Sequence, residues 1–509
     1  MELRGTNQLA TGVLVALLLA AGGASAAAPA NASLETYSKA REVIDAAVEA
    51  SGGADRLNGI TTVVTERSGT TWARNQSPKV AKPFEANEQA GRVILDLQGS
   101  RLLTEISGGF PGGVFANRTV ITEDDKFVLN LTSKTIQRND TLEIANFDFW
   151  HRLFPPLMLR KALQQANSLR WLGRTELDGR QHDMVSFAWD NGVLTPTLYI
   201  DSETHLVSKY ELLFSDNLTG DAVSELYFPG YRTVEGIQVP VGYKQIVGGV
   251  LAADLRYTTV IINQPVDESV FEVPFGYRDI APPPTGAPKV VELAKDVYMV
   301  EGLANFGYNF FFVAFDDHIL TFDASVNRAV SAQAIAQMKE AVPDKPIRYL
   351  VLSHHHDDHA GGLRAFIDEG ATVVTTAANR SYLEQMASTG STLGAGGPAG
   401  GLGEPTFGFV DGKRVFEDAG HVVEIHDIGP SPHAEEMLIV YLPKEKILFQ
   451  ADLLGIPRSG APAPANDVTV HFAEAIRKLD LEVEMLGGVH GTVGTMADLE
   501  DALRRRNME

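Results

Sequence analysis

The spacing of apolar positions changes along the chain. Residues 33–53 place apolar side chains near helical spacing and end in two glycines, which predicts an amphipathic helix. From about residue 58, apolar residues gather in short β-rich runs separated by Gly, Asn, Asp and Pro, which predicts a large antiparallel sheet. Residues 146–166, which contain two adjacent prolines, predict a helical interruption of that sheet.

The segment 281–289, APPPTGAPK, divides the chain, because its prolines make a stiff, extended spacer. After it, runs typical of strands alternate with runs typical of helices, which indicates a layered α/β domain. A chain of 509 residues also exceeds what one hydrophobic core usually organises. We therefore predict an α+β protein of two domains, a curved antiparallel sheet with helices over residues 33–280 and a layered domain over residues 290–509.

The first residues predict export. A short polar stretch, an apolar run of about a dozen residues and the small-residue sequence Ala24-Ser25-Ala26 are typical of a signal peptide over residues 1–26. The apolar run is shorter than the ~20 residues of a membrane-spanning helix, and no later segment is apolar for that length. We expect an exported protein, periplasmic or secreted, without a transmembrane segment in the mature chain.

Charge and cysteine content limit the chemistry. The formal net charge of −22 disfavours nucleic acid as a partner, because phosphate backbones are repelled by a surface of the same sign. The chain has no cysteine, so any metal ion has to be held by nitrogen and oxygen ligands.

The clearest chemical signal is LSHHHDDHAGG, residues 352–362. It follows an apolar strand, so His354 and His356 should point to one side of the extended chain and His355 to the other. Asp358 and His359 lie at the following turn and can approach the same point from a different direction. Imidazoles and carboxylates that converge in this way suit zinc or iron.

The order H-x-H-x-D-H, followed by Gly361 and Gly362, resembles the metallo-β-lactamase superfamily over residues 290–495. The resemblance implies an αβ/βα sandwich for the carboxy-terminal domain. It also implies one metal ion held by His354, His356 and His433, a second held by Asp358, His359 and His490, and Asp452 shared between the two. Asp323 matches a strand-end aspartate of the family, for which we expect a scaffolding role toward the ligand loop.

The resemblance further implies the reaction. Two divalent ions, with zinc favoured over iron or manganese, would yield a dinuclear-metal-bound hydroxide, and Asp358 would help to orient this nucleophile. We expect a hydrolase that cleaves an ester, lactone or amide in a small-molecule substrate of apolar character. The loops 388–409 and 455–467 are candidates for the substrate boundary, with a surface insertion as the equal alternative for the first.

Two other functions stay open. Some members of the superfamily use a single iron ion to oxidise persulfides, so a mononuclear iron persulfide dioxygenase is one alternative. Residues 35–275 loosely resemble periplasmic lipoprotein-carrier domains, so a carrier of lipid or another apolar ligand, with a vestigial metal domain, is the other.

The remaining histidines of the carboxy-terminal half have weaker claims. We expect His355 either to orient a ligand or to be exposed. We expect packing, surface or helix-start roles for the others, namely His318, His421, His426 and His471.

Overall fold

The computed structural model describes residues 31–508 apart from 141, 143–144, 190–193, 282–286, 304–306, 390 and 394–403. The expected signal peptide, most of the proline-rich spacer 281–289 and much of the loop 388–409 lie outside the described residues. Along the described part of the chain, every helix is either too short or too polar to cross a membrane.

One large sheet dominates the amino-terminal half. Its strands are β1 (Thr62–Trp72), β2 (Ala86–Asp96), β3 (Arg101–Phe110), β4 (Gly113–Ile121), β5 (Lys126–Asn130), β6 (Thr135–Arg138), β7 (Arg170–Leu177), β8 (Arg180–Ser186), β9 (Thr197–Asp201), β10 (Val207–Asp216), β11 (Gly220–Tyr227), β14 (Gly242–Val247), β15 (Val250–Ile262) and β16 (Arg278–Ile280). Within the described residues their order is β16-β6-β5-β4-β3-β2-β1-β15-β14-β11-β10-β9-β8-β7. Neighbouring strands are antiparallel except β16, which pairs with β6 in parallel. A separate hairpin joins β12 (Tyr231–Val234) and β13 (Ile237–Pro240).

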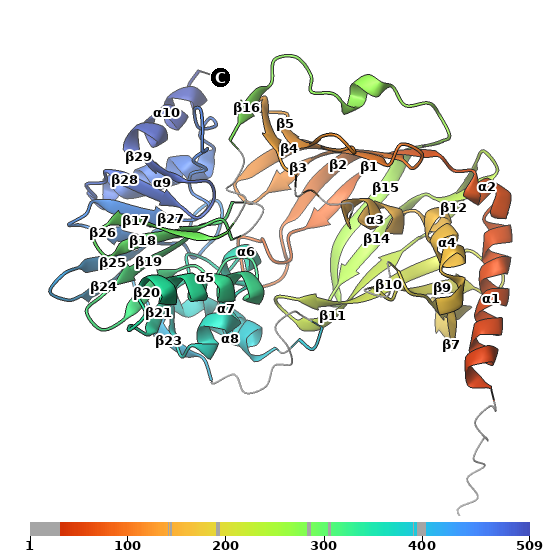
Figure 1. Cartoon of the computed structure of the whole chain (residues 1–509), viewed down its shortest axis with the longest axis horizontal. Helices are drawn as coiled ribbons and strands as arrows, with labels where there is room; N and C mark the ends of the chain where they lie inside the picture. Colours follow the sequence, from red (N-terminus) through yellow and green to blue (C-terminus); the bar gives the residue numbers. More distant parts are fainter. Residues whose placement is uncertain are drawn as a thin grey trace, which may run out of the picture.

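The sheet curves around helices (Figure 1). These are α1 (Ala32–Ala50), α2 (Ala54–Asn58), α3 (Ala145–Arg152), α4 (Pro155–Gln164) and the short η1 (Ala166–Ser168). Helix α1 buries Ala40, Ile44 and Ala47, at a spacing of one and two turns, against the same core as α4. The predicted opening helix, the antiparallel sheet and the helical interruption are therefore all present.

The described residues of the carboxy-terminal half form two sheets. The first runs β17 (Lys289–Ala294), β18 (Val297–Glu301), β19 (Phe310–Ala314), β20 (Ile319–Phe322), β21 (Ile347–Val351), β22 (Thr372–Thr375) and β23 (Thr406–Phe409) in sequence order. The second runs β24 (Lys413–Glu417), β25 (Val422–Asp427), β26 (Leu438–Leu442), β27 (Ile447–Gln450), β28 (Met485–Gly488) and β29 (Val493–Thr495), also in sequence order. A core of residues from both sheets lies between them, with Phe311 and Phe449 stacked at 4.5 Å.

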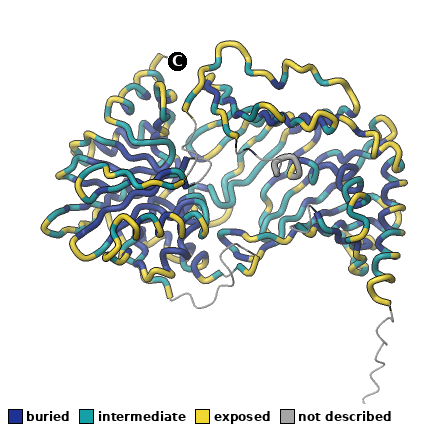
Figure 2. Tube along the Cα trace, viewed as in Figure 1, coloured by how far each residue is buried: buried dark blue, intermediate teal, exposed yellow. Residues whose placement is uncertain are grey.

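Helices cover the outer face of each sheet. The first sheet packs against α5 (Arg328–Ala341), α7 (Leu363–Asp368) and α8 (Arg380–Ser388), and the second packs against α9 (Asp467–Lys478) and α10 (Met496–Arg506). The succession of helices, two sheets and helices is the αβ/βα sandwich that we expected, and Figure 2 shows its buried strands at the centre. The whole chain is thus of the α+β class.

One short helix was not expected. The helix predicted over residues 361–370 is present as α7, and a separate turn of helix, α6 (Asp357–Ala360), precedes it. The break falls at Gly361 and Gly362, where a Cβ atom would lie within 3 Å of neighbouring atoms, including 1.9 Å from Ser331 Oγ at Gly362. The chain therefore passes too close to α5 for a side chain at this point.

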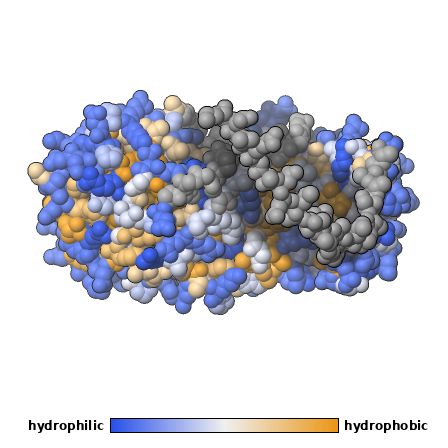
Figure 3. Space-filling view, turned by 90° about the horizontal axis from the view of Figure 1, so that it is seen from below, coloured by the Kyte–Doolittle hydropathy of each residue, from blue (hydrophilic) through white to orange (hydrophobic). Residues whose placement is uncertain are grey.

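The two halves meet along loops. The β1–β2 connection, residues 73–85, and the tight β3–β4 turn reach from the amino-terminal sheet to the carboxy-terminal half, where they contact residues near α6 and the β25–β26 connection. On the face shown in Figure 3, hydrophilic residues predominate, and apolar residues form smaller patches among them.

Candidate metal centre

The seven predicted metal ligands come from four loops and the short helix α6 at one edge of the sandwich. His354 and His356 follow β21, Asp358 and His359 lie in α6, His433 lies between β25 and β26, Asp452 follows β27, and His490 follows β28. Loops that leave the ends of neighbouring strands converge there, which brings residues 136 positions apart into one cluster.

The structure gathers these side chains into two groups that share one member. The first comprises His354, His356, His433 and Asp452, and the second comprises Asp358, His359, Asp452 and His490. In each group the atoms that could bind a metal ion lie within 4.8 Å of one another. Both groups are thus positioned to bind metal ions.

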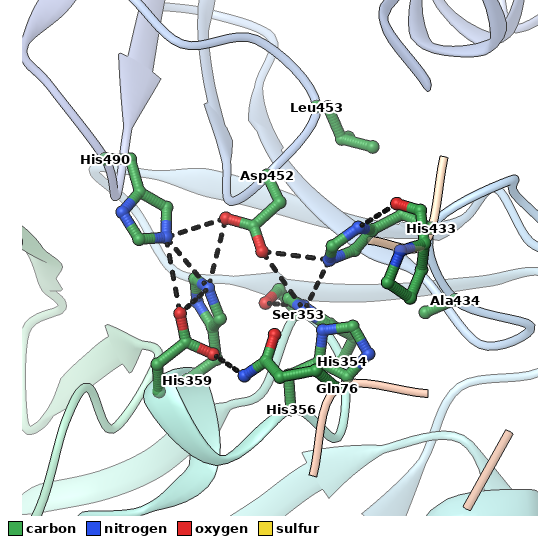
Figure 4. Close-up of polar contacts among 12 residues, drawn as sticks. Gln76, Ser353, His354, His356, His359, His433, Ala434, Asp452, Leu453 and His490 are labelled. Carbon is green, nitrogen blue, oxygen red and sulfur yellow. Dashed lines mark hydrogen bonds and ion pairs between the residues drawn. The ribbon is translucent and has the colours of Figure 1, made fainter. Parts of the chain in front are cut away.

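Asp452 connects the two groups through its two carboxylate oxygens (Figure 4). Its Oδ2 lies 2.9 Å from His433 Nε2 and 3.5 Å from His354 Nε2. Its Oδ1 lies 2.7 Å from His490 Nε2 and 3.2 Å from His359 Nε2. One carboxylate therefore offers a separate oxygen to each group.

Hydrogen bonds within the carboxy-terminal half fix two of the imidazoles. Asp323, fully buried, accepts hydrogen bonds from His359 Nδ1 at 2.8 Å and from the Ser353 hydroxyl at 2.9 Å. Because the hydroxyl proton of Ser353 is used on Asp323, its oxygen accepts from His354 Nδ1 at 2.9 Å. Asp323 thus has the scaffolding role expected of it.

Two other imidazoles are oriented from the amino-terminal half. The carbonyl oxygen of Ser77 accepts a hydrogen bond from His356 Nε2 at 3.0 Å, and that of Pro111 accepts one from His433 Nδ1 at 3.1 Å. A carbonyl oxygen only accepts, so each of these nitrogens carries the proton and the other ring nitrogen carries a lone pair.

These tautomers leave nitrogen lone pairs that face one another. His354 Nε2 and His433 Nε2 lie 3.2 Å apart, and the protons of both rings are used at Nδ1. Burial lowers the pKa of His354 to about 3, helped by the neighbouring His359, so this ring is neutral at ordinary pH. Two lone pairs at this distance repel each other unless a cation lies between them.

His356 adds a third such nitrogen. The side chain is fully buried, and its Nδ1 has no hydrogen-bond partner. A buried polar atom without a partner is costly, and coordination of a metal ion satisfies it. The donor set of nitrogen and carboxylate oxygen also fits zinc, iron or manganese.

The second group attracts positive charge. Burial lowers the pKa of His490, but the Asp452 carboxylate outweighs this effect, so the pKa rises to about 9. The pKa of His359 is likewise raised above its usual value, against the effect of burial, by Asp452 and Asp358. A site that stabilises protons on its imidazoles also favours a metal cation, which binds in competition with those protons.

Two residues that contact Asp358 carry no signal in the sequence. The Tyr308 hydroxyl donates to Asp358 Oδ2 at 3.1 Å, and its ring lies 4.6 Å from that of His490. The side-chain amide of Gln76, in the β1–β2 connection, donates to Asp358 Oδ1 at 2.7 Å. Neither residue stands near a ligand in the sequence, so only the fold brings them to the site.

The other histidines lie outside the cluster. His355 is buried, not exposed, and its Nε2 donates to the Ser77 carbonyl oxygen at 2.9 Å. The remaining four have packing or ion-pair contacts or lie within a helix: His318 pairs with Asp317, His421 with Glu445 and His426 with Glu424, and His471 lies in α9.

The match to a protein family covers the same cluster. Residues 307–490 carry a metallo-β-lactamase superfamily domain. This metallo-β-lactamase domain contains all seven clustered residues and indicates, at the level of the superfamily, a metal-dependent hydrolase. The resemblance of the amino-terminal half to lipoprotein-carrier domains stays a prediction.

Solved structures similar to the chain include a metallo-β-lactamase from Pontibacter korlensis, at 18% identity and a TM-score of 0.35, covering 44% of this chain and all of that one. The metallo-β-lactamase FIM-1 from Pseudomonas aeruginosa, in its mono-zinc form, has 20% identity and a TM-score of 0.34, covering 44% of this chain and 97% of that one. A search among curated proteins finds no match.

Proposed function

We propose that this protein is a hydrolase that uses two divalent metal ions, zinc foremost, to cleave an ester, lactone or amide bond in a small-molecule substrate. One ion would be held by His354, His356 and His433, the other by Asp358, His359 and His490, with Asp452 reaching both. The observation that carries the proposal is the placement of the two Asp452 oxygens, each directed at the imidazoles of a different group.

The chemistry follows from this ligand set. Two bound divalent ions would supply a water of lowered pKa and would polarise the carbonyl oxygen of the substrate. Seven protein ligands for two ions leave coordination positions for that water and for substrate, as in catalytic rather than structural sites. Asp358, held at one oxygen by Gln76 and at the other by Tyr308, would orient the attacking water.

The unequal burial of the ligands supports access of the substrate to the metal centre from the side of His490 and Asp358. His354, His356 and His359 are fully buried, whereas the side chains of His490 and Asp358 are 33% and 25% exposed. A cavity of about 380 Å³ adjoins His490 and is lined by Arg278, Ile456, Pro457 and other residues of both halves. Its size suits a small molecule, and the loop 455–467 supplies part of its wall.

Export of the protein remains part of the proposal and rests on the sequence of residues 1–26. An exported hydrolase would meet its substrate outside the cytoplasm. Cell fractionation with an antibody against the mature chain tests this point, because a cytoplasmic location with an intact leader would contradict it.

Metal analysis combined with a substrate panel tests the function. We expect purified protein to hold about two zinc ions per chain and to hydrolyse at least one class among lactones, aryl esters and β-lactams. His354→Ala should lose this hydrolysis, and the control His205→Asn, which changes an exposed histidine of the amino-terminal half, should keep it.

The outcomes also separate the alternatives. One iron per chain with oxygen uptake in the presence of a persulfide would favour the dioxygenase. Bound lipid, together with full activity of His356→Ala, would favour the carrier. Hydrolysis that His354→Ala retains would contradict the proposed function.

A further inference from the structure

The segment 75–79 of the amino-terminal half lies along the histidine motif. Besides the two hydrogen bonds that the Ser77 carbonyl oxygen accepts from His355 and His356, the backbone N–H of Asp357 donates to the Asn75 carbonyl oxygen at 3.3 Å. The next carbonyl oxygen of the loop, that of Pro78, accepts a hydrogen bond from the backbone N–H of Glu435 at 2.9 Å. The loop thus contacts both the motif and the connection that carries His433.

Gln76 holds two neighbouring carboxylates with one amide group. Its Nε2 donates to Asp357 Oδ1 at 2.9 Å and to Asp358 Oδ1 at 2.7 Å, which uses both of its protons. Asn75 donates to the other oxygen of Asp357 at 3.0 Å. Because Gln76 binds Oδ1 of Asp358, the other oxygen, Oδ2, is directed at His359 and His490. It lies 3.5 and 3.6 Å from their Nε2 atoms.

The β3–β4 turn makes a second contact with the cluster. It brings the Pro111 carbonyl oxygen to His433 Nδ1, and Gly112 follows at a φ of +85°. A Cβ atom on Gly112 would lie 2.2 Å from Val468 Cγ2, in the first turns of α9. The close approach of the two halves at this turn therefore depends on a residue without a side chain.

The loop is anchored within its own domain. Arg74, immediately before Asn75, forms a buried ion pair with Asp216 of β10. The Ser77 hydroxyl, in a side chain that is 2% exposed, accepts from the backbone N–H of Glu85 at 2.9 Å. The carbonyl oxygen of Ser77 therefore has a fixed position, and the imidazoles that donate to it are held in fixed orientations.

We propose that the amino-terminal domain is a structural part of the metal centre, in which the Ser77 and Pro111 carbonyl oxygens and the Gln76 amide orient His356, His433 and Asp358. The inference rests on the proposed function. Asp323 and Ser353 of the metallo-β-lactamase domain orient His359 and His354, while His356, His433 and Asp358 are oriented from the amino-terminal half.

Gln76 and Ser77 are positioning residues that act on different ions. Gln76 acts through Asp358, so its loss should weaken the ion held by Asp358, His359 and His490. The Ser77 carbonyl oxygen acts on His356 and is held in place by the hydrogen bond between the Ser77 hydroxyl and Glu85. Loss of the hydroxyl should therefore shift this carbonyl oxygen and weaken the ion held by His354, His356 and His433. Loss of a hydrogen-bond partner behind a metal ligand typically costs 10–100-fold in metal affinity.

The test is a metal titration of the full-length protein. Apo protein is titrated with Co²⁺ and Zn²⁺ against a chromophoric chelator, and the visible absorption of the Co²⁺ form is recorded. We expect Gln76→Ala to bind one ion about 10–100-fold more weakly and the other within about threefold of wild type. The control Gln98→Ala, an exposed glutamine of the same domain far from the loop, should match wild type.

Ser77→Ala supplies the second arm. We expect it to weaken the ion that Gln76→Ala leaves unchanged, and to alter a different part of the Co²⁺ spectrum. Ser77→Thr, which keeps the hydroxyl that accepts from Glu85, should restore the affinity. A general loss of structure would weaken both ions in both variants, and that result would overturn the inference.

The failures of the two proposals are distinguishable. If wild-type protein binds two ions and both variants bind them with the same affinity and spectrum, the amino-terminal domain has no part in the centre, and the proposed function stands. If folded wild-type protein binds no transition metal, the proposed function fails and this inference fails with it.

Discussion

His359 Nδ1 lies 2.8 Å from Asp323 Oδ2, and both side chains are fully buried. The same carboxylate accepts hydrogen bonds from the backbone N–H and the hydroxyl of Ser353, at 2.7 and 2.9 Å. Asp323 follows β20 with a φ of +63°, a left-handed conformation that aspartate tolerates better than most residues. One residue thus joins the strand edge, the start of the ligand loop and a ligand of the second group.

Replacing this carboxylate tests its orienting role. Asp323→Asn replaces one carboxylate oxygen by an NH₂ group, which cannot accept a hydrogen bond. At least one of the three donors, from Ser353 and His359, then loses its acceptor. We expect metal affinity to fall about 10–100-fold and the free energy of unfolding of the apo protein to fall by about 1–3 kcal/mol. Metal titration and denaturant unfolding measure the two effects, with the exposed Asp344→Asn as control. Unchanged affinity would show that Asp323 is not needed to orient His359.

Tyr308→Phe removes the hydroxyl that donates to Asp358 Oδ2 and leaves the ring beside His490. We expect kcat/KM to fall about 5–20-fold, because one hydrogen bond to a charged group contributes about 1.5–3 kcal/mol at most and the ligand remains. Steady-state kinetics on the best substrate of the panel measures the change. Tyr298→Phe, at a tyrosine stacked on Phe312, is the matched control. Equal losses in both variants would contradict the role of Tyr308.

The sequence predicted the metal ligands, because they lie in a local motif or directly after recognisable strands. H-x-H-x-D-H places four of the seven ligands within six residues, and the other three, His433, Asp452 and His490, follow strand ends. The sequence could not predict Gln76, Ser77 or Pro111, because they act through contacts between segments more than 270 residues apart. A backbone carbonyl has no residue type, so its role leaves no mark in the sequence.

The main elements of the fold were also predictable from the sequence. Short β-rich runs separated by turn residues predicted the antiparallel sheet, and alternating strands and helices predicted the layered domain. The short helix α6 was not predicted, because the break that separates it from α7 depends on how closely the chain passes Ser331 of α5. Helical spacing reports which face is buried, but not how near a neighbouring element lies.

Removing metal should lower stability. Without a cation, the lone pairs of His354 and His433 face each other at 3.2 Å beside the carboxylate of Asp452. An ion present at 1,000 times its Kd stabilises the folded state by about 4 kcal/mol. We expect chelation to lower Tm by several degrees and added zinc to restore it, as measured by calorimetry. A Tm that does not change on chelation would argue against metal binding at this site.

The ion pair between Arg74 and Asp216 should make stability depend on pH. Burial raises the pKa of Asp216, but its hydrogen bond with Arg74 outweighs this effect and lowers the pKa below the usual 3.8. The stabilisation is therefore present above about pH 3.8 and is lost as the pH falls through the pKa of the folded state. Asp216→Asn leaves a buried arginine unpaired, which should cost about 3 kcal/mol at pH 7.

Denaturant unfolding at pH 7, 5, 4 and 3 measures this difference. We expect the gap between wild type and Asp216→Asn to stay constant down to about pH 4 and to shrink below it. Asp45→Asn, which breaks an exposed pair with Arg41, should cost at most about 0.5 kcal/mol at any of these values. A gap of the same size at pH 3 as at pH 7 would contradict a role for the ionised Asp216.

Anomalous diffraction from crystals grown with zinc shows directly whether the cluster holds a pair of metal ions. We expect two zinc peaks ~3.5–4 Å apart. One should lie ~2.0–2.1 Å from His354 Nε2, His356 Nδ1 and His433 Nε2, and the other at bonding distance from Asp358, His359 and His490, with Asp452 between them. A well-ordered crystal with no anomalous peak among these residues, or with zinc only elsewhere on the molecule, would contradict it.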